Sequence, residues 1–146
     1  MKVLTDSSAL AKRYVLEVGS DEIDRFLQNA SQLGLCTILI PEVISGLNRR
    51  RRENNLSDDA YRTIKNQLMD DVHDAVILQV TPAVISYSIK LLETNVVRAM
   101  DALHIACALE WNAELFVTAD RRQYKAAINA GLPCEFIGQQ SLAGDG

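Results

Sequence analysis

Four acidic residues stand at the ends of apolar segments, where their side chains could share one chemical task. In chain order they are Asp6, Glu42, Asp101 and Asp120. Carboxylates about 5 Å apart in a partly buried cleft repel one another by roughly 3 kcal/mol per pair at an effective dielectric near 20, so such a cluster needs a cation or must protonate. All-oxygen ligation suits Mg²⁺ or Mn²⁺, and a bound ion of this kind activates water for phosphodiester hydrolysis.

The same acids have a simpler interpretation, in which each one only caps a helix. An aspartate at a helix N-terminus stabilises the helix by about 1 kcal/mol, and any one of the four is explained in this way. Their joint placement favours a shared site. The sequence contains no P-loop, GxGxxG, GxSxG or DxDxT motif that would indicate a rival chemistry.

The elements that must position these acids alternate between strand-like and helix-like patterns. Short β-rich runs predict strands at residues 2–5, 35–40, 75–80, 115–118 and 134–137. Helical spacing, caps and stops predict helices at residues 7–14, 20–30, 42–52, 57–72, 81–93, 100–111 and 124–130. This alternation predicts an α/β fold with a parallel sheet, whose strand ends gather at one edge.

Composition limits the class of protein. The chain has 146 residues, of which 48% are hydrophobic and 23% charged, as in globular domains. No segment approaches the roughly 18 apolar residues of a membrane span, and the first residues lack a signal-peptide pattern, so we expect a cytoplasmic protein. Three cysteines without a CxxC pair predict buried thiols. The net charge of −4 is not typical of a nucleic-acid-binding protein, although a basic patch can lie beside an acidic site.

Four segments together resemble the PIN-domain family, and within it the VapC-like ribonuclease toxins of type II toxin–antitoxin systems. They are TDSSALAKRY at 5–14, IPEVISGLNR at 40–49, RAMDALHIACAL at 98–109 and VTADRR at 117–122. The resemblance implies a three-layer α/β/α PIN-like fold with a mainly parallel sheet of about five strands. It also implies a single PIN domain over residues 1–141, and we expect residues 142–146 to form a flexible tail.

The resemblance implies an endoribonuclease that depends on Mg²⁺ or Mn²⁺, with the four acids holding the metal. Ser8 and Thr118 match hydroxyl positions that help to order such a site, and Arg98 is placed to orient Asp101 by an ion pair. It further implies a homodimer that a separate VapB-like antitoxin inhibits. Two alternatives stay open: a PIN nuclease of RNA processing without an antitoxin, and a binding module that holds metal for structure alone.

The remaining polar residues have competing interpretations. The four arginines Arg49, Arg50, Arg51 and Arg52 could contact RNA, contact an acidic antitoxin, or form a solvated helix end favoured by the helix dipole. His104 could be a proton shuttle or ligand, but we expect a buried, hydrogen-bonded structural histidine. We expect Trp111 in the core or in a subunit contact rather than as a base-stacking platform.

Overall fold

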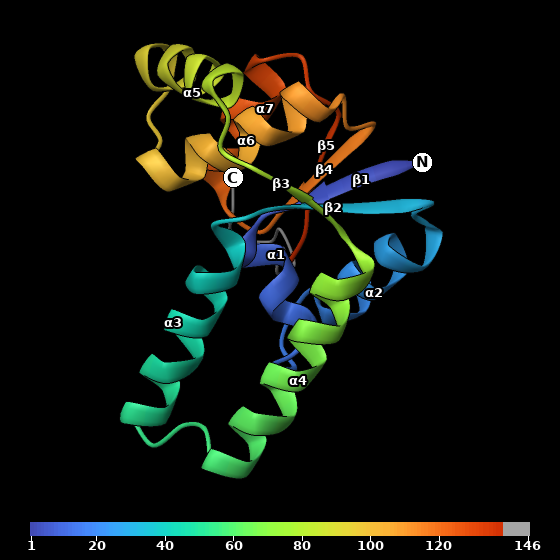
Figure 1. Ribbon diagram of the computed structural model, residues 1–146, viewed down its shortest axis with the longest axis vertical. Helices are drawn as coiled ribbons and strands as arrows, with labels where there is room; N and C mark the ends of the chain where they lie inside the picture. The colour runs from blue at the N-terminus through green and yellow to red at the C-terminus, as the bar shows by residue number, and fades with distance from the viewer. Residues whose placement is uncertain (139–146) are drawn as a thin grey trace, which may run out of the picture.

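A five-stranded parallel sheet forms the centre of the molecule, for which a computed structural model describes residues 1–138 (Figure 1). The strand order is β3-β2-β1-β4-β5, and every neighbouring pair is parallel. The strands are β1 (Lys2–Thr5), β2 (Gln32–Cys36), β3 (Val76–Leu78), β4 (Leu115–Thr118) and β5 (Cys134–Phe136). The predicted tail at residues 142–146 lies outside the described residues.

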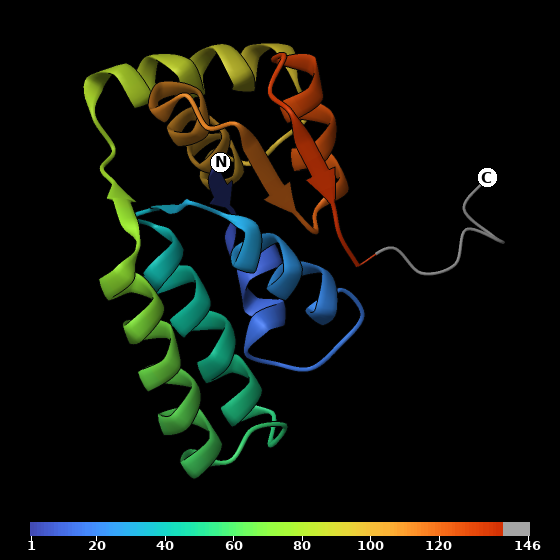
Figure 2. The same ribbon diagram turned by 90° about the vertical axis from the view of Figure 1, so that its right-hand side faces the viewer.

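Helices cover both faces of this sheet (Figures 1 and 2). They are α1 (Ser7–Leu10), the 3₁₀ helix η1 (Ala11–Arg13), α2 (Ser20–Asn29), α3 (Leu39–Arg52), α4 (Asp58–Asp74), α5 (Pro82–Thr94), α6 (Ala99–Trp111) and α7 (Arg121–Asn129). Leu4 and Phe116 pack with α5, α6 and α7 on one face, while Val3 and Leu35 contact the core on the other face. The predicted three-layer α/β/α architecture is therefore confirmed.

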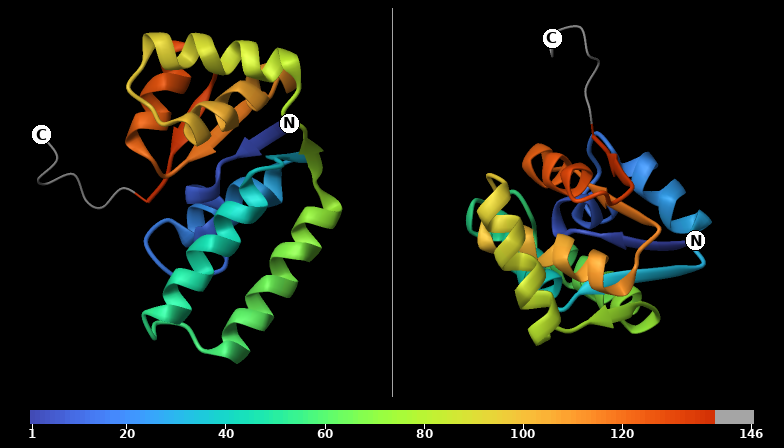
Figure 3. Two further views of the ribbon diagram at one scale, coloured as in Figure 1. Left: turned by 60° about the vertical axis from the view of Figure 1, so that its left-hand side comes forward. Right: turned by 90° about the horizontal axis from the view of Figure 1, so that it is seen from above.

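Helices α3 and α4 form an antiparallel hairpin that extends away from the sheet (Figure 3). As predicted, Ser57 caps α4, because its hydroxyl accepts a hydrogen bond from the backbone N–H of Ala60. Thr81 caps α5 in the same way, with Pro82 at the first helical position. Within residues 1–138, no helix is long and apolar enough to cross a membrane.

The predicted second strand at residues 35–40 is displaced in the structure. Strand β2 ends at Cys36, and α3 already begins at Leu39, so Pro41, which precedes the predicted helix at 42–52, is the third residue of α3. Leu35 and Leu39 are both fully buried, because this apolar run completes a strand and then opens a helix on the same core. A short apolar run does not distinguish a buried strand from a buried helical turn. Glu42 consequently lies inside the first turn of α3.

Trp111 packs at the edge of the core, in agreement with one of its two predicted roles. Its ring lies against Gly34 of β2, and Lys2 Nζ lies 4.5 Å from the ring centroid. Cys36 and Cys107 are buried free thiols, as expected, whereas Cys134 is only half-buried.

Candidate active site

Asp6 is the most deeply buried of the four candidate carboxylates. It follows β1, caps α1 and has no exposed surface. Its carboxylate accepts hydrogen bonds from Thr118 Oγ1 at 2.6 Å, from Ser8 Oγ at 2.8 Å and from the Ala9 N–H at 2.9 Å. Burial raises the pKa of Asp6, although the charge of His104 and these hydrogen bonds oppose the rise. The two hydroxyls named from the sequence therefore hold this carboxylate.

Glu42 is held in place by His104, a contact that the sequence did not indicate. Its Oε1 accepts a hydrogen bond from Ser7 Oγ at 3.2 Å and lies 2.6 Å from Nε2 of the fully buried His104. Burial works to raise the pKa of Glu42, but the hydrogen bond and charge of His104 outweigh it and lower the pKa. Burial likewise opposes protonation of His104, but the hydrogen bond to Glu42 and the charges of Asp6 and Glu42 outweigh it and raise the imidazole pKa.

His104 is thus buried and hydrogen-bonded, as predicted, and its partner is one of the candidate acids. The two residues are 62 positions apart, on α6 and α3. The pattern of the sequence around His104 indicated burial but gave no sign of this partner.

Asp101 lies in the first turn of α6 with 5% of its surface exposed. Its Oδ2 accepts hydrogen bonds from Arg98 Nε at 3.3 Å and from the Arg98 N–H at 3.4 Å, so the predicted ion pair is present. Its Oδ1 accepts from Gln123 Nε2 at 3.1 Å. The sequence analysis did not single out Gln123.

Asp120 caps α7 at the end of β4. Its Oδ1 accepts hydrogen bonds from the N–H groups of Arg122 at 2.8 Å and Gln123 at 3.1 Å. Its own N–H donates to Thr118 Oγ1 at 3.0 Å. Thr118 therefore touches both Asp6 and Asp120 and links two of the four acids.

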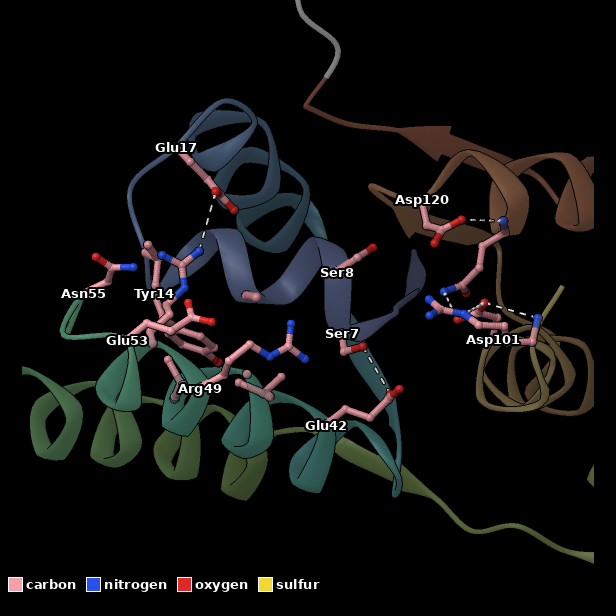
Figure 4. Close-up of a pocket in the computed structure, with 18 residues that line it drawn as sticks. Ser7, Ser8, Tyr14, Glu17, Glu42, Arg49, Glu53, Asn55, Asp101 and Asp120 are labelled. Atoms are coloured by element: carbon pink, nitrogen blue, oxygen red, sulfur yellow. Dashed lines mark hydrogen bonds and ion pairs between the residues drawn. The ribbon is translucent and has the colours of Figure 1, made fainter.

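Three of these acids, Glu42, Asp101 and Asp120, line one cleft of about 530 Å³ (Figure 4). Glu42 comes from α3 on one side, and the two aspartates come from α6 and α7 on the other. Asp6 does not line the cleft but lies behind Ser8, which does. The structure thus brings three predicted residues to one surface and buries the fourth beside it.

The four arginines of α3 separate into different environments. Arg49 and Arg50 line the cleft together with Glu17 and Glu53, and Arg50 Nη2 lies 4.0 Å from Glu17. Arg51 is held outside the cleft, because it pairs with Asp58 at 2.8 Å and stacks over the ring of Tyr61. Arg52 is exposed at the helix end.

The chemistry of the cleft fits a hard divalent cation, since Glu42, Asp101 and Asp120 line it together with the hydroxyl residues Ser7 and Ser8. No group of three or more His, Cys, Asp or Glu side chains among residues 1–138 is arranged as a ready-made ligand set. A cation here would therefore be held by one or two carboxylates together with water, which is the usual arrangement for Mg²⁺.

The chain was compared with known protein families, curated sequences and solved structures. No curated protein sequence matches the chain. Among solved structures, DNA-bound VapBC from Salmonella typhimurium is similar with a TM-score of 0.68 and 15% identity, covering 93% of this chain and 98% of that one. The sarcin-ricin-loop-cleaving toxin VapC20 of Mycobacterium tuberculosis is similar with a TM-score of 0.66 and 14% identity, covering 85% and 94%.

A third similar structure is VapBC2 from Rickettsia felis bound to a promoter DNA fragment, with a TM-score of 0.66 and 15% identity over 93% of this chain and 98% of that one. At these identities the solved structures establish the fold. The sequence itself matches the PIN domain family over residues 3–129, which is most of its length. The chain therefore belongs to the PIN domain family.

Proposed function

We propose that the protein is a divalent-metal-dependent endoribonuclease that hydrolyses RNA phosphodiester bonds and acts as the toxin of a type II toxin–antitoxin pair. The observation that carries this proposal is the cleft, in which the candidate acids Glu42, Asp101 and Asp120 lie together with Arg49, Arg50 and Arg98. Membership of the PIN domain family and the similarity to an RNA-cleaving toxin support it.

In this proposal the carboxylates of Glu42, Asp101 and Asp120 hold Mg²⁺ or Mn²⁺ directly or through water, with Asp6 behind them. When bound, the ion polarises a phosphoryl oxygen and lowers the pKa of a bound water. The protein's own groups fix the acids: Ser8 and Thr118 hydrogen-bond to Asp6. This packing presets the carboxylates before substrate arrives, so little reorganisation is required on binding.

His104 and Arg98 fix two of the acids in the same manner. His104 contacts Glu42, and Arg98 pairs with Asp101. The buried imidazole restricts the rotation of the Glu42 side chain, while the exposed guanidinium closes one side of the Asp101 carboxylate. Each acid is thereby supplied with a partner that sets its orientation in the cleft.

Arg49 and Arg50 are proposed to contact the phosphates of the RNA. They line the same cleft as the acids. Guanidinium groups bind phosphate oxygens through two parallel hydrogen bonds, and such contacts position a nucleic acid without reading its sequence. The RNA backbone would then pass over these two arginines toward the carboxylates.

We expect a homodimer in the cytoplasm that is inhibited by a VapB-like antitoxin. The similarity to VapBC structures supports the antitoxin. The dimer is supported by three exposed apolar residues on α5, which are Ile85, Ile89 and Leu92. Their spacing places them on one helix face. Sedimentation of the purified protein should give the mass of a dimer, and Ile89→Glu should shift it to a monomer; a monomeric wild type would contradict the dimer.

A metal-holding module without catalysis is the second candidate. It is favoured by the contacts of Glu42 Oε1 with His104 and Ser7, which leave that oxygen less available to a reacting group in the cleft. A nuclease of RNA processing without an antitoxin differs from the toxin in its genetic setting. Growth arrest on expression, relieved by a small neighbouring gene, would separate the toxin from it.

The test is cleavage of single-stranded RNA by the purified protein with Mn²⁺ or Mg²⁺, with EDTA, and with Asp101→Asn. We expect cleavage that requires the metal and is lost in the variant. Equal cleavage by both proteins would refute the site. Binding of metal without cleavage of any RNA would favour the non-catalytic module.

A further inference from the structure

Gln123 joins two of the candidate acids through two different groups. Its side-chain Nε2 donates to Asp101 Oδ1 at 3.1 Å, and its backbone N–H donates to Asp120 Oδ1 at 3.1 Å. Only 2% of the residue is exposed, yet it lines the same cleft as both aspartates. One residue on α7 therefore sets the position of Asp101 on α6 relative to Asp120.

The other end of the Gln123 amide has no partner. Its Oε1 is buried and accepts no hydrogen bond from any residue in the range 1–138. The amide cannot turn round to satisfy this oxygen, because that would place Oε1 against the carboxylate of Asp101 and lose the donated hydrogen bond. A buried acceptor without a partner is costly, so its presence at the cleft calls for a donor that is not part of the protein.

We propose that Gln123 is a positioning residue of the metal site: its amide N–H orients Asp101 beside Asp120, and its Oε1 accepts a hydrogen bond from a water on the bound divalent cation. This inference rests on the proposed metal-dependent function. Mg²⁺ and Mn²⁺ retain several waters in protein sites, and those waters are strong donors.

A neutral amide suits this position better than the alternatives. A carboxylate at residue 123 would repel Asp101, and an apolar side chain would leave the Asp101 Oδ1 without its donor. The amide supplies one donor to Asp101 and one acceptor that no residue in the range 1–138 uses. It does so without adding to the negative charge of the three acids.

The test is the affinity for Mn²⁺ alone, measured by isothermal titration calorimetry on the full chain. Gln123→Met keeps the length of the side chain and removes both of its hydrogen-bonding groups. We expect it to weaken Mn²⁺ binding about tenfold, as loss of an outer-sphere partner does. The matched control is Gln67→Met, at an exposed position on α4 away from the cleft, which should bind Mn²⁺ like the wild type.

The outcomes separate this inference from the proposed function. Wild-type Mn²⁺ affinity in folded Gln123→Met would overturn the role of Gln123 alone, because a merely structural residue changes stability and not metal affinity. No Mn²⁺ binding by the wild type would overturn the metal site and this inference together.

A second variant covers the case in which Gln123→Met does not fold. Gln123→Glu keeps an acceptor oxygen but places a negative charge against Asp101. A cation relieves that repulsion, so Mn²⁺ should raise the unfolding temperature of Gln123→Glu by more than it raises that of the wild type. A shift no larger than that of the wild type would overturn the inference.

Discussion

Asp71 on α4 is the centre of a polar clamp that ties α4 to η1 beside the cleft. Arg13 Nε and Nη2 donate to its two oxygens at 2.8 and 3.2 Å, and Tyr14 Oη donates at 2.7 Å. The hydrogen bond to Asp71 raises the pKa of Arg13, and burial followed by Asp71 raises the pKa of Tyr14. Since Tyr14 also lines the cleft, this clamp supports one of its walls.

The substitution Asp71→Asn removes the charge and leaves the shape of the side chain nearly unchanged. Breaking a fully buried ion pair costs about 3–5 kcal/mol. Here the side chains of Arg13 and Asp71 are 30% and 18% exposed, so solvent screens the pair in part. The asparagine oxygen, placed where Oδ2 lies, also keeps two of the three hydrogen bonds. We therefore expect a loss of about 2 kcal/mol in the free energy of unfolding.

Urea unfolding followed by circular dichroism measures this loss. With a slope of about 2 kcal/mol per molar urea, the midpoint should fall by about 1 M. Asp70→Asn is the matched control, because Asp70 is the exposed neighbour on the same helix. Its free energy of unfolding should stay within a few tenths of a kcal/mol of the wild type. Equal midpoints for the two variants would refute the reasoning about the clamp.

Two further pairs of substitutions test the cleft and the core. Replacing Arg49 and Arg50 by alanine should weaken RNA binding about tenfold in low salt and reduce its salt dependence, as measured by fluorescence anisotropy, whereas Arg52→Ala should change little. An equal effect of Arg52→Ala would argue against a specific cleft contact. Gly34→Ala places its Cβ 2.5 Å from an indole ring and should cost about 1–3 kcal/mol of stability. Gly46→Ala, whose Cβ meets nothing within 4 Å in the interior of α3, should instead stabilise the protein by about 0.5–1 kcal/mol. Thermal unfolding distinguishes these last two, and a stable Gly34→Ala protein would contradict the packing of β2.

Local patterns in the sequence were sufficient for the architecture and for contacts between near neighbours. The alternation of apolar runs predicted the parallel sheet, and the three-residue spacing of Arg98 and Asp101 predicted their ion pair. Both depend on patterns that are local in the sequence, which the sequence displays directly. The predicted boundary between β2 and α3 was wrong, because the sequence shows no local change there: residues 35–40 are apolar on both sides of the true boundary.

Contacts between distant elements could not be predicted in this way. The pair of Glu42 and His104 depends on how α3 meets α6, and the hydrogen bond of Gln123 to Asp101 depends on how α7 packs against α6. Neither residue belongs to a motif that names its partner. The burial of Asp6 behind Ser8 depends likewise on the packing of α1 against β4. The sequence therefore named Asp6 as a candidate but did not show that it lies behind the cleft lining.

The most direct test of the account is single-turnover cleavage of a labelled single-stranded RNA in Mn²⁺ by conservative variants of the four acids. The variants are Asp6→Asn, Glu42→Gln, Asp101→Asn and Asp120→Asn, with Asp70→Asn as the control. Each site variant should remain folded and lose activity by a factor on the order of 100 or more, and EDTA should abolish cleavage by the wild type. Cleavage that survives EDTA, or wild-type rates in folded variants of the cleft acids, would contradict a metal-dependent carboxylate site.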